Sequence, residues 1–156
     1  MDELNKPVKF KKFEINFTKN EYEWFGKVDH FGEFESIEFS IDLRTNSFTD
    51  NNWEKLPAFF DFLDINLKIF IQKSIQPLIS FATHSNYFSS RELENLEPVF
   101  LNWVQILDNI HTAFDSKWKF ELEFEMMNNE EPIDTYGRWI ITFSGICISG
   151  IRRIDW

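Results

Sequence analysis

Hydrophobic residues recur at helical spacing over residues 93–114 of the chain. The steps between them alternate between three and four positions, and the intervening residues are mostly polar, as on a helix with one buried face. These apolar positions are Leu93, Leu96, Phe100, Trp103, Leu107, Ile110 and Phe114. Pro98 fits the first turn of such a helix if Asn95 is the N-cap, because first-turn N–H groups have no intrahelical partner. The pattern therefore predicts a long amphipathic helix that begins near Leu96.

A second helical pattern begins at Trp53. Large apolar residues again recur every three or four positions as far as Phe70, and the polar residues 50–52 precede the run as candidate caps. Pro57 lies near the start, where its missing N–H costs little, whereas Pro77 is expected to kink or end the helix. The sequence thus predicts a deeply buried helix from Trp53 to about Pro77, with at most one further turn.

Alternation of apolar and polar residues marks three strands before these helices and two after them. The first strand, residues 8–17, changes parity at Lys11 and Lys12, which predicts a β-bulge because one extra residue restores the inward face. The remaining predicted strands cover residues 22–28, 37–43, 118–126 and 137–149. The last of these is apolar on both parities, so we expect it to be a central strand with a Ser144 that lies mid-strand.

The order of three strands, two helices and two strands predicts an α+β fold. Short connections make the first three strands an antiparallel meander, and the last two form a hairpin that pairs with it. We therefore expect an antiparallel sheet of about five strands with two long helices packed on one face. A length of 156 residues without a linker or an internal repeat indicates a single domain over residues 1–156.

Charge and aromatic content restrict the classes of partner. The chain has 26 acidic and 16 basic residues, a formal charge of -10, which argues against nucleic acid and anionic membranes but allows a basic protein partner. Aromatic residues make up 18% of the chain, including 19 Phe and 6 Trp. They could fill a Phe-rich core or supply a protein-binding surface, and the sequence leaves both readings open.

The sequence also indicates a compartment. Cys147 is the single cysteine, so no intrachain disulfide is possible and a reducing compartment fits best. Because it lies on an apolar strand, we expect it to be buried. The first residues lack the apolar region of a signal peptide, and no apolar run approaches the roughly 20 residues of a membrane-spanning helix. The expectation is a cytoplasmic protein that does not bind membranes.

Candidate catalytic and metal-binding residues are few. His30, His84 and His111 are far apart, and none has a second His or Cys at ligand spacing, which argues against structural zinc. Ser144 and Gly145 lack the G-x-S-x-G pattern of a nucleophile turn, and the glycines here lack the Lys and Ser or Thr of a P-loop. We therefore expect no metal, no cofactor and no catalytic residues.

Two rows of acidic residues remain as a candidate site. They lie at even spacing on the outward face of two predicted strands and comprise Glu38, Asp42, Glu121, Glu123 and Glu125. If those strands share a sheet, the rows could combine into one negative surface that steers a basic partner. The alternative is an ordinary solvated sheet face. On the first hypothesis, reversing the last three charges would weaken capture of a basic partner without unfolding the protein.

Three segments carry a family resemblance. They are residues 31–34 (Phe-Gly-Glu-Phe), the helix led by Trp53, and the ending from Gly137 and Trp139 to residues 152–156. In outline the chain resembles the small acidic domains that bacteria carry as immunity proteins against polymorphic toxins, or as uncharacterised neighbours of them. The resemblance implies a stoichiometric binder that neutralises a basic toxin by covering its active site, and it transfers no site residue.

Together these observations predict a non-catalytic protein-binding domain, such as an immunity protein that neutralises a basic toxin partner by stoichiometric binding. A structural or self-associating domain, in which the aromatic surface forms a homo-oligomer, is the first alternative. An enzyme of an unrecognised type is the second, and it would require a deep pocket with convergent polar groups and shifted carboxylates.

Overall fold

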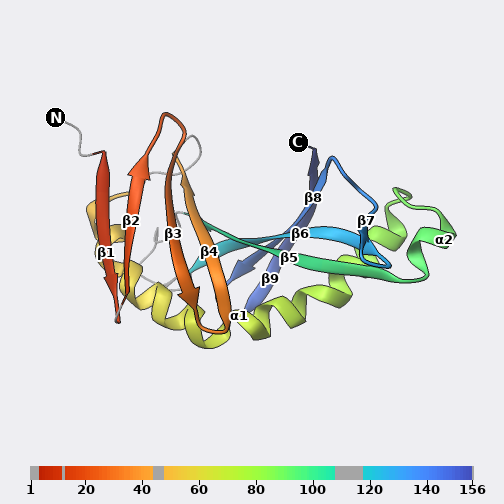
Figure 1. Cartoon of the computed structure of the whole chain (residues 1–156), viewed down its shortest axis with the longest axis horizontal. Coiled ribbons are helices and arrows are strands. Elements are labelled where there is room, and N and C mark those ends of the chain that lie inside the picture. Colours follow the sequence, from red (N-terminus) through yellow and green to blue (C-terminus); the bar gives the residue numbers. More distant parts are fainter. Residues whose placement is uncertain (1–3, 12, 44–47, 108–117, 156) are drawn as a thin grey trace.

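The computed structural model of the chain describes residues 4–11, 13–43, 48–107 and 118–155. The strands are β1 (Asn5–Phe10), β2 (Phe13–Lys19), β3 (Glu23–Phe31), β4 (Phe34–Asp42), β5 (Leu96–Leu107), β6 (Lys119–Asn128), β7 (Glu131–Pro132), β8 (Gly137–Ser144) and β9 (Cys147–Asp155). The helices are α1 (Asp50–His84) and α2 (Ser90–Leu93). Figure 1 shows all of these elements, with α1 beneath the strands.

All the strands belong to one mixed sheet. Its order is β1-β2-β3-β4-β5-β6-β8-β9, and the short β7 pairs with β6 off this path. Strands β4 and β5 are parallel, whereas the other pairs are antiparallel. The parallel pair arises because α1 carries the chain from β4 back to the start of β5, and parallel strands need such a crossover.

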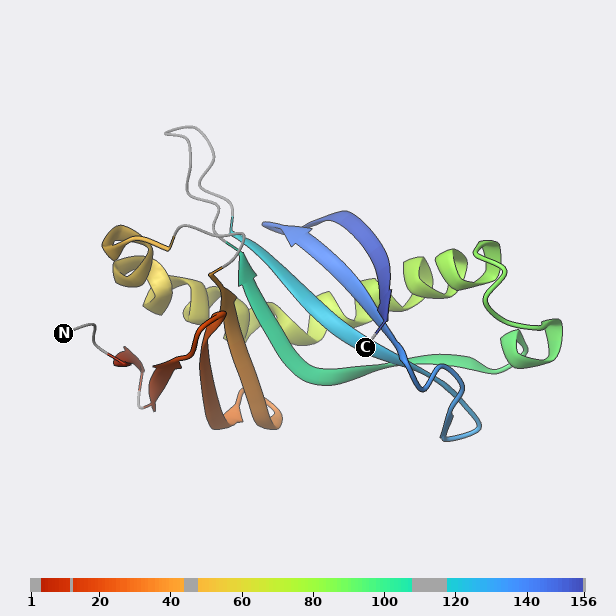
Figure 2. The same ribbon diagram turned by 90° about the horizontal axis from the view of Figure 1, so that it is seen from above.

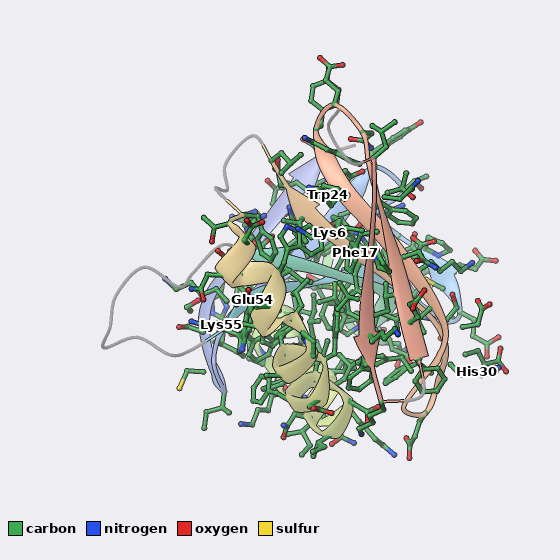
Figure 3. The ribbon with its side chains drawn as sticks, turned by 90° about the vertical axis from the view of Figure 1, so that its left-hand side faces the viewer. Lys6, Phe17, Trp24, His30, Glu54 and Lys55 are labelled. Carbon is green, nitrogen blue, oxygen red and sulfur yellow. The ribbon has the colours of Figure 1, made fainter. Side chains whose placement is uncertain are left out.

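Helix α1 covers one face of the sheet along its whole length of 35 residues. Its buried side is the apolar stripe that the sequence predicts, including Trp53, Phe60 and Phe70. The helix begins after Thr49, whose backbone N–H donates to Asn52 Oδ1 at 3.1 Å. Phe17 and Trp24 lie between the sheet and α1, as Figure 3 shows. The core is therefore a layer of aromatic rings between one helix and one sheet.

The predicted fold class is wrong, because the predicted helix that begins near Leu96 is a strand. Residues 96–107 form strand β5 instead of a helix, so the described part of the chain is mainly β, with nine strands and one long helix. Both faces of β5 are apolar: Val104 and Ile106 face the core, and Leu101 and Trp103 face the other way. Apolar residues on both parities imitate the three-and-four spacing of a helix. The rest of the predicted helix, residues 108–114, lies outside the described ranges.

Four smaller predictions also fail. The parity change near Lys11 marks a hairpin, in which Phe10 pairs with Phe13, instead of a bulge within one strand. Residues 137–149 are split by a second hairpin, because Gly145 takes the positive φ of 59° that a tight turn requires. Ser144 therefore ends a strand, and Cys147 is exposed rather than buried. Pro77 lies inside α1, which continues to His84.

A bulge in β5 shapes the sheet. Phe100 pairs with Phe124 and Val104 with Leu122, so four steps along β5 match two along β6. Between them, Asn102 has a positive φ of 56°, a conformation that Asn tolerates better than most residues. Bulges bend the strand that carries them and re-aim nearby side chains. Figure 2 shows β5 curving between the two halves of the sheet.

Candidate functional site

The face of the sheet opposite α1 holds two adjoining cavities of about 410 and 330 Å³. We call them together the groove. Its lining residues are Tyr22, Glu23, Phe25, Glu38, Asp42, Leu101, Trp103, Gln105, Glu123, Arg138, Ile140, Arg152 and Ile154. One wall comes from β3 and β4 and the other from β8 and β9, although β5 and β6 separate these pairs in the sheet (Figure 1). The curvature of the sheet therefore creates the groove.

Trp103 is the central residue of the groove. It lines both cavities together with Glu23, and its side chain is only partly buried. Trp103 lies directly opposite Glu38 in the register of β4 and β5, immediately after the bulge at Asn102. Leu101 lines the same cavity from the other side of the bulge. The bulge thus places two apolar side chains on the open face of β5, while the opposite face of the same strand contributes residues to the core.

The acidic residues of β6 lie on this face but are compensated by arginines. The guanidinium of Arg152 donates to both oxygens of Glu121, at 2.8 Å for Nη2, and Thr142 Oγ1 donates to the same carboxylate at 3.0 Å. Arg138 lies 3.2 Å from Glu123. Glu121 and Glu123 are buried, with 5% and 6% of their surfaces exposed. They are therefore ion-paired residues beneath the groove and do not form an open acidic surface.

Glu125 completes this network, since its carboxylate lies 3.8 Å from Arg138 Nη1. The two predicted acidic residues of β4 behave differently. Glu38 and Asp42 are half-buried, line the opposite wall and face the groove. The structure thus brings all five predicted site residues to one face, but it divides them between a wall at β3 and β4 and a compensated row on β6.

Burial changes the acidity of Glu123. Removal from water raises the pKa of this carboxyl to about 7, an effect that Arg138 opposes and the nearby Glu121 reinforces. Glu123 lies next to Ile140 on β8 and opposite the bulged part of β5, and these neighbours explain why its carboxyl is shielded from water. The groove therefore contains one carboxyl that changes its charge close to neutral pH.

Ser40 contributes an unsatisfied hydroxyl on the groove side of β4. It lies between Glu38 and Asp42 at alternate positions, is fully buried, and its Oγ has no hydrogen-bond partner among the described residues. A buried unpaired hydroxyl costs about 1–3 kcal/mol. Its direct neighbours across the adjacent strands are Phe25 on β3 and Gln105 on β5.

Ser40→Ala is therefore expected to stabilise the protein. The substitution removes an unpaired buried hydroxyl, so the free energy of unfolding should rise by about 1 kcal/mol, measured by urea denaturation. Ser74→Ala is the matched control, because Ser74 is equally buried but its hydroxyl donates to Phe70 O at 2.7 Å. Equal effects of the two substitutions would show that the Ser40 hydroxyl is satisfied in solution.

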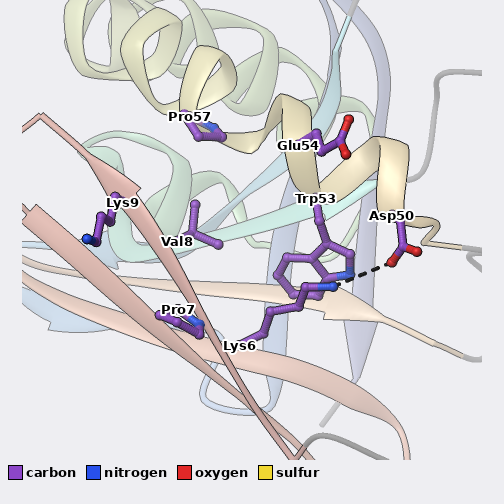
Figure 4. A pocket seen from close by; sticks show the side chains of 8 residues that line it. All are labelled: Lys6, Pro7, Val8, Lys9, Asp50, Trp53, Glu54 and Pro57. Atoms are coloured by element: carbon purple, nitrogen blue, oxygen red, sulfur yellow. Dashed lines mark ion pairs between the residues drawn. The ribbon is translucent and has the colours of Figure 1, made fainter.

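A third cavity, of about 470 Å³, lies between edge strand β1 and the first turns of α1 (Figure 4). Lys6 Nζ lies 4.8 Å from the centre of the Trp53 ring and 3.6 Å from Asp50 Oδ1. Pro7 lacks an N–H, and Lys9 lines the cavity beside it. Proline and lysine on an edge strand discourage pairing with another chain. Although this cavity is larger, its lysine is already paired, and we read it as a protected sheet edge.

The two histidines that the structure describes do not form a site. His30 is exposed near the end of β3 and points away from the core in Figure 3, and His84 ends α1 with Nδ1 2.7 Å from Ser80 O. His111 lies outside the described residues. Within the part of the chain that the structure describes, no group of three or more His, Cys, Asp or Glu side chains could hold a metal ion.

Sequence reasoning missed ten of the thirteen residues that line the groove, among them Phe25, Trp103, Arg138 and Arg152. The helical spacing of residues 93–114 places Trp103 on a helix face, and no local pattern connects the arginines with the acidic row. One signal was available in the sequence. Arg138 and Ile140 are two positions apart on one strand, as are Arg152 and Ile154 on the next, so each pair places a charged and an apolar side chain on the same face. Strand order, which the sequence does not give, was needed to pair them with Glu121 and Glu123.

The fold and the groove define a mixed-sheet domain with one covering helix and an open, curved face. Comparison with protein-family models, with curated proteins and with solved structures found no match. Among the described residues, no helix combines the length and the apolar character needed to cross a membrane.

Proposed function

We propose that this chain is a non-catalytic protein-binding domain that holds a segment of a partner protein in the groove. The observation that carries the proposal is the placement of Trp103 between two cavities on the open face of the sheet. Tryptophan is enriched among the residues that dominate binding energies. Phe25, Leu101 and Ile154 supply further apolar surface beside it. A partner segment in the groove would remove this surface from water.

The charge distribution supports a basic partner. Glu23, Glu38 and Asp42 line the wall at β3 and β4, and the whole chain has a formal charge of -10. Charge complementarity of this kind raises the association rate and selects against wrong partners. Neutralisation of a basic toxin, as in immunity proteins, is the more specific form of this proposal and rests on the sequence resemblance. The free, exposed thiol of Cys147 supports a location in a reducing compartment such as the cytoplasm.

Photo-crosslinking tests the proposal. A photoreactive amino acid at Gln105, inside the groove, should give one prominent adduct with another protein in a lysate of the native cell, identified by mass spectrometry. The same amino acid at Gln72, on the exposed side of α1, is the matched control and should not give that adduct. Adding Trp103→Ala should reduce the adduct at Gln105 at least about fivefold, because truncation of a hot-spot residue weakens binding by more than 1 kcal/mol.

Two outcomes would contradict the proposal. Equal adducts at Gln105 and Gln72 would mean that the groove has no special role. An adduct of twice the mass of the chain would favour the self-associating domain, and sedimentation at several protein concentrations would then show a mass that rises with concentration.

One observation favours an enzyme as a second candidate. Glu123 lines the groove and has a pKa raised to about 7, a value suited to a general acid or base. None of the residues that line the groove is His, Cys, Ser or Lys, and both arginines are engaged by carboxylates. We therefore prefer binding. Glu123→Gln should leave the Gln105 adduct intact, whereas an enzyme that uses this acid would lose turnover.

A further inference from the structure

One of the two cavities of the groove combines apolar walls with charged ones. Its volume of about 330 Å³ is at the small end of the roughly 300–1,000 Å³ of small-ligand sites, so it suits a single side chain better than a folded surface. We call it the Glu38 cavity, and it is lined by Glu23, Phe25, Glu38, Leu101, Trp103, Glu123 and Arg138. The cavity can therefore hold a ligand that has both an apolar body and a charged end.

Glu38 is the available carboxylate of this cavity. It lies directly opposite Trp103 in the register of β4 and β5 and is half-buried, and its carboxylate forms no ion pair or side-chain hydrogen bond with a described residue. Ser40 lies two positions along on the same side of β4, where its buried Oγ also lacks a partner among the described residues. Two acceptors on this side of β4 are therefore unused, and Glu38 is the one that a ligand can reach.

The other charges that line the cavity leave it negative. Arg138 Nε lies 3.2 Å from Glu123 Oε1, and Arg138 Nη1 lies 3.8 Å from Glu125 Oε1, so two carboxylates share this cation. Glu23 accepts a side-chain hydrogen bond from Asn20, a neutral donor that does not cancel its charge. A cationic ligand would therefore meet the cavity favourably, whereas an anionic ligand would meet it unfavourably.

Lys27 is placed to compete with such a ligand for Glu38. It lies directly opposite Glu38 in the register of β3 and β4, but its side chain is exposed and makes no ion pair with Glu38. An exposed pair of this kind contributes little, because water screens it and two long side chains lose freedom when they pair. A ligand cation that also contacts the Trp103 ring has an additional attraction, so it can displace Lys27 from the neighbourhood of Glu38.

We propose that the Glu38 cavity takes one arginine side chain of the partner protein, whose guanidinium pairs with Glu38 and stacks on Trp103. This inference rests on the proposed function and specifies its ligand. A guanidinium is flat, donates through a fixed fork of N–H groups and stacks on aromatic rings, whereas a lysine ammonium is compact and strongly hydrated. The methylene groups of the arginine would lie against Phe25 and Leu101.

NMR titration of the isotope-labelled protein with short peptides tests the inference. The probe is acetyl-Gly-Arg-Gly-amide, in which the guanidinium is the only charge. The readout is the signal of the Trp103 indole N–H, assigned by its loss in Trp103→Phe. One comparison peptide carries citrulline, which has the shape of arginine without the charge, and the other carries lysine. We expect the arginine peptide to bind at least about tenfold more tightly than the citrulline peptide and at least about threefold more tightly than the lysine peptide.

Three variants connect this preference to the cavity. Glu38→Gln should weaken binding of the arginine peptide at least about tenfold, because it removes the carboxylate and keeps the shape of the side chain. Lys27→Gln should strengthen binding about twofold, because the cation opposite Glu38 is removed. Glu54→Gln is the matched control, since it changes the net charge equally but lies exposed on α1, which covers the opposite face of the sheet (Figure 3). Equal weakening by Glu38→Gln and Glu54→Gln would overturn the inference.

The remaining outcomes separate the inference from the proposed function. Equal affinity of the arginine and citrulline peptides, or no shift of the Trp103 signal with either, together with a Gln105 adduct, would overturn the arginine site and leave the protein-binding function standing. Equal affinity of the arginine and lysine peptides would overturn the stacking on Trp103. Selective binding of the arginine peptide without the adduct would overturn the proposed function alone. Absence of both peptide binding and the adduct would overturn both proposals.

Discussion

Glu121→Lys is expected to lower the free energy of unfolding by about 3–4 kcal/mol, in contrast to the mild effect that the sequence alone suggests. Glu121 is 5% exposed and accepts hydrogen bonds from Arg152 and Thr142. Removing one partner of a buried pair leaves the other uncompensated, and a lysine adds repulsion from Arg152. We place the loss within this range because the Arg152 side chain remains 47% exposed and water screens part of the repulsion.

Urea denaturation of the variant and of Glu38→Lys measures the contrast. Glu38 is half-buried and has no ion-pair partner among the described residues, so its reversal should change the free energy of unfolding by less than about 1 kcal/mol. Exchanging the charges in Glu121→Lys with Arg152→Glu should recover part of the loss, as a double-mutant cycle would show. Equal stability of the two single variants would refute the ion pair between Glu121 and Arg152.

Glu123→Gln is expected to stabilise the protein above neutral pH and to have little effect in mild acid. In the native state the pKa of Glu123 is about 7, whereas the unfolded chain releases this proton near its usual value of 4.5. Between these values the native state binds more protons, so the free energy of unfolding falls as the pH rises. The loss at pH 8 reaches up to about 3 kcal/mol, and glutamine, which does not ionise, avoids it.

Unfolding measured from pH 4.5 to 8 in both proteins tests this expectation. The difference between them isolates Glu123, because carboxyls with a lowered pKa, such as Asp134 beside Arg153, act at lower pH and are present in both. Their stabilisation is lost only as the pH falls through the lowered pKa. Glu125→Gln, on the same strand and near the same arginine, is the matched control. A constant difference across the range would mean that Glu123 is ionised throughout.

Local sequence patterns predicted the elements whose buried side is simple. The stripe from Trp53 to Phe70 lies on one helix because every third or fourth residue faces the same core. Alternation likewise predicted most of β3, β4 and β6, each of which has one strongly apolar face.

Strand β5 could not be predicted because both of its faces carry apolar residues, one in the core and the other in the groove. Val104 and Ile106 pack in the core while Leu101 and Trp103 line the groove, and the bulge at Asn102 shifts the register between them. In the local sequence pattern all four residues are simply apolar positions, and the pattern does not show that they lie on opposite faces of a strand. The period of the pattern therefore looked helical, although the chain is extended.

The long helix led by Trp53 and the acidic residues at alternate positions of β4 and β6 follow from the sequence alone, whereas the sequence left open whether the aromatic residues fill the core. Tertiary structure brings Glu121 against Arg152 and Glu123 against Arg138, because these contacts join residues more than a dozen positions apart through strand order. It also decided that β3–β4 and β8–β9 meet across a groove, since the curvature of the sheet depends on the parallel pairing of β4 with β5 and on the β5 bulge. Local periodicity reports which face of an element is apolar, whereas strand order and curvature are properties of the assembled sheet.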